Sequence, residues 1–178
     1  MSDRLTVARA RTGRVIFDTF RSHYDPRLAA WLLLRSHFLP ELAAAHLEAQ
    51  AATPSESIVS LGVFGVWRLL ATNNRELARC AAVYTSPAAA VAAARRDQSR
   101  AADLQLTAVR GPGSTKHGWI LRSAGVPVVT TARWYESAGE AMAAGRTAVN
   151  VFASAQVVDG VSIGTPSGRR SRVLDRTT

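Results

Sequence analysis

Two stretches of the chain, YTSPAAAVAAA at residues 84–94 and YESAGEAMAAG at residues 135–145, are near copies of one another. Each has a tyrosine, then a serine two residues later, then an alanine-rich run. Serine is a favourable helix N-cap, and Pro87 follows Ser86 at the first helical position, where its missing N–H has no cost. Ser137 and Glu140 have the spacing of a capping box. Both stretches therefore predict a helix, over about residues 87–100 and 138–151.

The pattern continues upstream of each stretch, where a tryptophan opens a segment that the tyrosine closes. Trp67 precedes Tyr84 and Trp119 precedes Tyr135, with two apolar runs and a turn between them. The turn at residues 72–74 contains two asparagines, which tolerate positive φ. Another short apolar segment follows each helix, from residue 104 and from residue 154. Each copy is therefore predicted to form two strands, a helix and a third strand.

A unit of this size is too small to bury its own sheet well, whereas two units can share one core. We therefore predict an α+β fold in which two tandem ββα(β) units share an antiparallel sheet and core, preceded by a strand and a helical hairpin. The predicted repeat domain spans residues 58–158, with its units at 63–110 and 114–158.

This tandem pattern resembles the small YegP-like domain of unknown function, which is found in bacteria and archaea and often occurs twice in one chain. The resemblance covers roughly residues 63–158, and its matching positions are Trp67, Tyr84 and Ser86, then Trp119, Tyr135 and Ser137. Both turns depart from the family's usual Asn-Gly. The resemblance implies an α+β fold of paired units and no established activity, so it supplies no catalytic residues.

Residues 1–57 do not match the repeat and predict an N-terminal arm, a strand over residues 13–20 and a helical hairpin. Asp25 and Pro26 have the cap and first-residue chemistry of a helix start. Apolar side chains cover most of the circumference of this helix, so we expect it to be buried or to bind a partner. A second, amphipathic helix is predicted from Pro40, followed by a linker at residues 53–57. The predicted partner interface consists of Trp31, Leu32, Leu34 and Phe38.

The chain of 178 residues has a formal net charge of +9, and Lys116 is its only lysine. Arginine binds phosphate through a planar fork, so this bias suits nucleic acid. A GC-rich genome gives the same bias to every protein it encodes. The predicted nucleic-acid or anion contacts lie in the N-terminal arm, between the two copies, and in a flexible basic tail at residues 159–178. They are Arg9, Arg11, Arg14, Lys116, Arg169, Arg170 and Arg172.

Other chemistry is not indicated. The single cysteine, Cys80, allows no intramolecular disulfide and is predicted to be buried and inert. The four histidines have no companions at metal-ligand spacing, so we expect no metal and no cofactor. No Ser-His-Asp arrangement follows from spacing, and we expect no enzyme activity. The N-terminus lacks a signal-peptide pattern and no apolar run could cross a bilayer, so we expect a cytoplasmic protein without a membrane partner.

Two functions of different classes follow. The first is a non-enzymatic protein-interaction or scaffold module that associates with itself or another chain through the apolar helix or an open sheet edge. The alternative is a basic protein that contacts nucleic-acid phosphates through its arginine-rich arms without sequence specificity. The first predicts an oligomer that survives high salt, and the second predicts binding that weakens steeply with salt.

Overall fold

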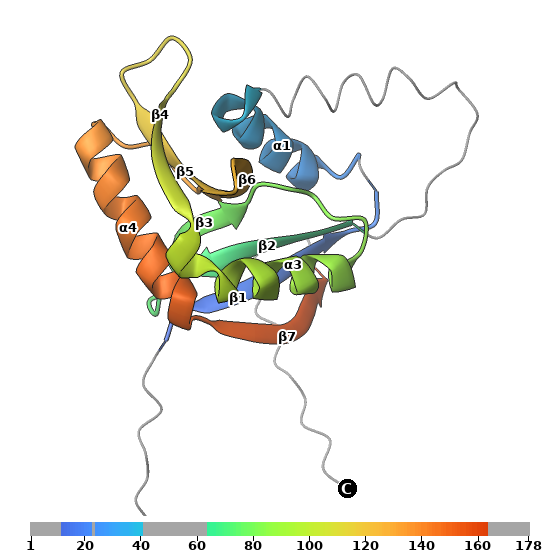
Figure 1. Cartoon of the computed structure of the whole chain (residues 1–178). Coiled ribbons are helices and arrows are strands. Elements are labelled where there is room, and N and C mark those ends of the chain that lie inside the picture. The colour runs from blue at the N-terminus through green and yellow to red at the C-terminus, as the bar shows by residue number, and fades with distance from the viewer. Residues whose placement is uncertain (1–11, 23, 41–63, 164–178) are drawn as a thin grey trace, which may run out of the picture.

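The computed structural model describes residues 12–22, 24–40 and 64–163, and these residues form one seven-stranded sheet with three α-helices (Figure 1). The predicted α+β class is confirmed. The strands are β1 (Arg14–Phe20), β2 (Phe64–Leu70), β3 (Glu76–Cys80), β4 (Gln105–Arg110), β5 (His117–Ser123), β6 (Val126–Thr131) and β7 (Gln156–Ile163). The helices are α1 (Pro26–Phe38), α3 (Pro87–Ser99) and α4 (Ala138–Ser154), with a short 3-10 turn at Ala101–Asp103.

The strand order is β4-β5-β6-β3-β2-β1-β7. Two hairpins, β2–β3 and β5–β6, meet in the middle through the antiparallel pair β3–β6. Each hairpin is followed in the chain by a helix and then by an edge strand, which is β4 after α3 and β7 after α4. Ser86 and Ser137 cap the two helices as predicted, each accepting a hydrogen bond from the backbone N–H three residues on.

Both hairpins share an irregularity that shortens the predicted second strands. In the segment that Tyr84 closes, the second strand ends at Cys80, and Tyr84 then pairs with Gly65 as an isolated bridge. Tyr135 pairs with His117 in the same way after β6 ends. In each hairpin, the first strand has three residues between the bridge position and a regular pair, counted as a difference in number, whereas the second strand has five. The regular pairs are Arg68 with Arg79 and Ile120 with Thr130. The two extra residues form a bulge that carries the chain toward the helix that follows.

Helices α3 and α4 cover one face of the sheet and form most of the core. Trp67 of β2 is fully buried and stacks on Phe152 of α4, with ring centroids 5.2 Å apart. Gly65 allows a close approach of α3, because a Cβ there would lie 3.0 Å from the carbonyl oxygen of Ser86. Gln98 of α3 donates hydrogen bonds to two carbonyls at the end of α4, at 2.7 and 2.8 Å.

Helix α1 lies on the other face of the sheet (Figure 1). The guanidinium of Arg79 lies over the ring of Trp31, 4.8 Å from its centre. Side chains alternate between the faces of a strand, and Ala78 and Cys80 on either side of Arg79 belong to the main core. Arg79 therefore points away from the face that α3 and α4 cover. At the other end of α1, Phe38 packs on Trp134 with ring centroids 4.1 Å apart. The described residues therefore form three layers: α1, the sheet, and α3 together with α4.

Three details differ from the sequence predictions. The sheet is not wholly antiparallel, because β1 and β7 are parallel. Residues 159–163 belong to β7 rather than to a flexible tail, because pairing with β1 continues to Ile163. The sheet also crosses the predicted boundary between residues 57 and 58, because β1 lies between β2 and β7. The predicted second helix of the hairpin and the predicted linker lie outside the described residues.

Candidate functional site

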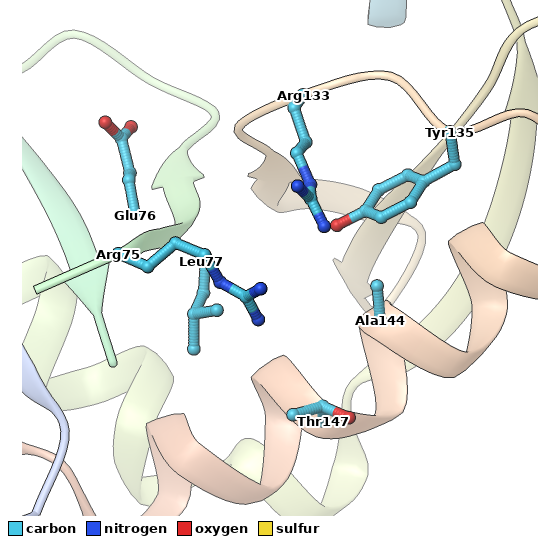
Figure 2. A pocket seen from close by; sticks show the side chains of 7 residues that line it. All are labelled: Arg75, Glu76, Leu77, Arg133, Tyr135, Ala144 and Thr147. Carbon is cyan, nitrogen blue, oxygen red and sulfur yellow. The ribbon is translucent and has the colours of Figure 1, made fainter. Parts of the chain in front are cut away.

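A small pocket lies between the β2–β3 turn, the chain after β6, and α4 (Figure 2). Its volume is about 60 Å³. Figure 2 shows the guanidinium groups of Arg75 and Arg133 and the phenol oxygen of Tyr135 pointing toward a common space above Thr147. We call these four residues the arginine pocket, which is further lined by Glu76, Leu77 and Ala144.

Backbone features fix the two arginines at the rim of this pocket. Asn74 has a φ of 65°, which asparagine tolerates, and the turn closes with the N–H of Ala71 donating to the carbonyl of Arg75 at 2.8 Å. Arg133 lies in the bulge before Tyr135, where the Thr131 hydroxyl donates to its carbonyl at 2.9 Å. The Arg133 guanidinium lies 4.9 Å from the centre of the Tyr135 ring. Both positions therefore depend on turn and bulge geometry rather than on strand alternation.

Within the described residues, the positive charge of the arginine pocket has no carboxylate partner. The pocket's one carboxylate, Glu76, points away from both guanidiniums in Figure 2. That carboxylate instead pairs with Arg68, at 3.3 Å, and with Arg79. Among the described residues, no carboxylate forms an ion pair with Arg75 or Arg133.

A larger cleft of about 370 Å³ lies between α1 and the sheet, lined by residues that include Phe20, Trp31 and Arg68. Each arginine that lines it pairs with a carboxylate: Arg27 with Asp25, Arg68 with Asp18, and Arg79 with Glu76. Arg68 donates two hydrogen bonds to the carboxylate of Asp18, at 2.6 and 3.2 Å. Burial opposes the charge of Arg68, but Asp18 and Glu76 outweigh it and raise the pKa of Arg68. These paired groups explain the cleft as part of the packing of α1 on the sheet.

The predicted anion contacts are only partly within the described residues. Arg14 is exposed at the start of β1 and donates a hydrogen bond to the side chain of Asn74, next to Arg75. Lys116 forms an ion pair with Glu136. The other predicted contacts, Arg9, Arg11, Arg169, Arg170 and Arg172, lie outside the described residues. Sequence reasoning missed Arg75 and Arg133, because only the folded turn and bulge bring them together.

The predicted partner interface on α1 needs correction. Trp31 is 6% exposed and Phe38 is 3% exposed, so both pack inside the chain. Leu32 and Leu34 are half-buried, whereas Leu33 between them is 63% exposed. Spacing of three and four residues places Leu28, Trp31, Arg35 and Phe38 on one face of the helix, and that face meets the sheet. This heptad pattern was the available signal for the direction of α1.

The open edge at β4 is a second candidate surface. Among the described residues, β4 pairs only with β5, and four of its six residues are exposed. The strand contains no proline, lysine or acidic residue, and Arg110 at its end is its single charge. Proline, charge and coverage by other elements are the usual protections of an edge strand. β4 therefore presents an unprotected row of backbone hydrogen-bonding groups.

Cys80 is buried as predicted, and burial raises the pKa of its thiol to about 12. Its sulfur accepts a hydrogen bond from the N–H of Trp67 at 3.2 Å. The described residues contain no group of three or more potential metal ligands from His, Cys, Asp and Glu. No helix in the described part of the chain has the length and apolar character needed to cross a membrane.

Comparison with known proteins identifies one similar solved structure and no named relative. It is the solution structure of yegP, a protein of unknown function from E. coli, with 16% identity and a TM-score of 0.42. The match covers 58% of this chain and 86% of that one. No family model matches the chain, and no curated protein matches it.

Proposed function

We propose that this protein is a non-enzymatic interaction module that associates with a second copy of itself through the open edge of β4. The single observation that carries this proposal is the unprotected edge of Gln105–Arg110. An extended strand with free backbone groups is a template for another strand. Addition of a second β4 would continue the sheet across a two-fold axis, which is the commonest symmetry of protein dimers.

The direction of the backbone groups in β4 supports this mode. The N–H of Gly111 donates to the carbonyl of Lys116 at 2.9 Å, just past the end of the β4–β5 ladder. Inward and outward groups alternate along an antiparallel strand, and the β4–β5 register is regular from Gln105 to Arg110. The N–H and C=O groups of Leu106, Ala108 and Arg110 therefore point away from β5.

These outward groups are compatible with symmetric pairing. A two-fold axis at Ala108 places this residue opposite Ala108 of the second copy, and Leu106 opposite Arg110 of the second copy. The positions that form hydrogen bonds in this register, Leu106, Ala108 and Arg110, all have outward N–H and C=O groups, and the alanines leave room at the axis. No two like charges lie directly opposite one another, so the pairing avoids the usual electrostatic cost.

The test uses two substitutions of Ala108. Ala108→Pro removes an outward N–H while leaving the bonds to β5, and proline is tolerated on edge strands. Ala108→Val keeps the N–H and is the matched control. Size-exclusion chromatography with light scattering, at about 0.1 M and about 1 M salt, should show a dimer for the native chain and for Ala108→Val. Ala108→Pro should be a monomer with a native-like melting temperature.

A native chain that is monomeric at both salt concentrations would contradict the proposed function. A dimer that persists in a folded Ala108→Pro variant would assign the contact to another surface, of which the exposed Leu33 on α1 is the first to test.

The alternative function, contact with nucleic-acid phosphates, has a separate signature in the same experiment. Protein prepared without nuclease would elute together with nucleic acid at low salt and free of it at high salt. Arg14 is the predicted arm residue that lies within the described residues, beside Arg75 at the β2–β3 turn. This proximity supports a basic surface at that turn, whichever ligand it binds.

We also infer that the two hairpin-helix-strand segments are copies of one small YegP-like domain. Equivalent positions support this relation, because Trp67 and Trp119 are both fully buried. The tyrosine bridges and the serine caps also recur in both segments. Sequences of relatives test this inference. We expect the two segments to align better with each other than either does with unrelated ββαβ units.

A further inference from the structure

We propose that the arginine pocket binds one phosphate group, either as inorganic phosphate or as the terminal phosphoryl group of a small ester. The chemistry is the convergence of two guanidinium groups, a phenol and a threonine hydroxyl on one hollow of about 60 Å³. Guanidinium forks match the geometry of phosphate oxygens, and the Tyr135 hydroxyl can donate to a remaining oxygen.

The charge of the pocket favours an anion over a neutral ligand. Arg75 and Arg133 approach the same space from different segments of the chain (Figure 2). The carboxylate of Glu76 points away from them and pairs with Arg68 and Arg79. Two like charges near one hollow repel one another, and a dianion between them removes this repulsion. Phosphate monoesters carry about 1.5 to 2 negative charges at pH 7, and inorganic phosphate is a mixture of monoanion and dianion, whereas a phosphodiester carries one charge.

The pocket is partly ordered before a ligand arrives. The Tyr135 ring supports the Arg133 guanidinium at 4.9 Å, and the backbone of Tyr135 is held to His117 by two hydrogen bonds of 2.7 and 2.8 Å. The Thr147 hydroxyl donates its single proton to the carbonyl of Ala143 at 3.1 Å, so it can donate to a phosphate oxygen only by leaving that bond. Groups held in place lose less conformational entropy on binding.

The size of the pocket restricts the ligand. A hollow of about 60 Å³ accommodates one tetrahedral oxyanion but not a nucleoside. The apolar lining is limited to Leu77, Ala144 and the Tyr135 ring, so the pocket has no extended surface for an organic group. Recognition is therefore directed to the phosphate itself, with the rest of an ester in solvent.

The experiment is calorimetric titration of the full chain at constant ionic strength, with inorganic phosphate in one arm and phenyl phosphate in the other. We expect saturable binding at one site, weakened about tenfold or more by Arg133→Ala and by Arg75→Ala. Arg133→Lys keeps the charge but loses the fork, and should weaken binding less than the alanine variant. Tyr135→Phe should weaken binding a few-fold. Melting temperatures of all variants establish that each is folded.

The matched control is Arg146→Ala, because Arg146 is also exposed and lies on α4 beside Thr147 but does not line the pocket. It should change the dissociation constant by less than about twofold, because exposed charges are screened by salt. Binding that is equally sensitive to Arg146 would overturn the pocket in favour of general charge attraction. Absence of saturable binding of both ligands to the native chain would also overturn it.

A third arm separates the small ligand from nucleic acid. A single-stranded oligonucleotide without terminal phosphates contains only diesters. If it binds with the same dependence on Arg75 and Arg133 while inorganic phosphate does not compete, the proposal is wrong and the pocket belongs to a nucleic-acid surface. If inorganic phosphate binds alone and phenyl phosphate does not, the free ion is the ligand. Binding of both assigns the pocket to phosphoryl groups in general.

Discussion

Asp97 is a buried acidic residue whose ionised side chain destabilises the folded chain. It is 3% exposed within α3, and one carboxylate oxygen lies 3.4 Å from the guanidinium of Arg96. The other oxygen accepts no hydrogen bond from the described residues. Burial raises the pKa of Asp97, with a smaller opposing effect from Arg96 and Arg100. An acid whose pKa is raised by folding destabilises the native state wherever it is ionised.

This effect predicts that Asp97→Asn stabilises the folded chain, and that the stabilisation depends on pH. Below the unfolded pKa, near 3.8, the carboxyl is protonated in both states and makes no difference. As the pH rises through the unfolded pKa toward the folded one, the unfolded chain loses its proton first and the native chain loses stability. The variant cannot ionise, so its melting temperature relative to the native chain should be higher at pH 7 than at pH 3.5. Circular dichroism melts check this, and an equal difference at both pH values would contradict it.

At the scale of elements, the docking of α1 depends on space left by a strand of the sheet. Phe38 packs in a small cluster with Leu39, Ala81 and Ile120 on the face opposite α3 and α4. A Cβ added at Gly118 of β5 would overlap the Phe38 ring, so this position requires the absence of a side chain. The absence of a side chain at Gly118 therefore leaves the space in which the Phe38 ring packs.

Gly118→Ala should destabilise the chain by about 1–3 kcal/mol, because the buried Phe38 ring must move and lose its contact with Trp134. This corresponds to a fall in melting temperature of roughly 2–4 °C per kcal/mol for a chain of this length. Gly139→Ala is the control, because the nearest atom to its added Cβ would be 3.9 Å away. A thermal melt in which both variants behave alike would show that Gly118 has no such role.

At the scale of the whole molecule, the N-terminal strand joins the sheet rather than preceding it. β1 pairs with all seven residues of β2 and also with β7, so it bridges the first hairpin and the last strand of the chain. Val15 and Phe17 of β1 are fully or almost fully buried in the main core. Loss of this strand would expose both neighbouring strands and part of the core.

A fragment of residues 58–178 should therefore fail to fold cooperatively, although it contains the whole predicted repeat domain. A fragment of residues 12–163, which keeps every described strand, is the comparison. Thermal melts and dispersion of amide NMR signals distinguish the two. A cooperative transition in the shorter fragment at a native-like temperature would restore residues 58–158 as an independent domain.

The sequence by itself determined the class of this fold and the start of each repeated helix. Serine caps, asparagine turns and runs of apolar residues act over a few positions, so they can be read along the chain. The tertiary structure decided where β1 and β7 lie, which face of α1 is buried, and which arginines meet. Trp31 and Phe38 face the sheet because another segment of the chain leaves space for them. Arg75 and Arg133 converge because a turn and a bulge from different hairpins are neighbours in space. These relations depend on contacts between segments far apart in the chain, and local patterns do not encode their partners.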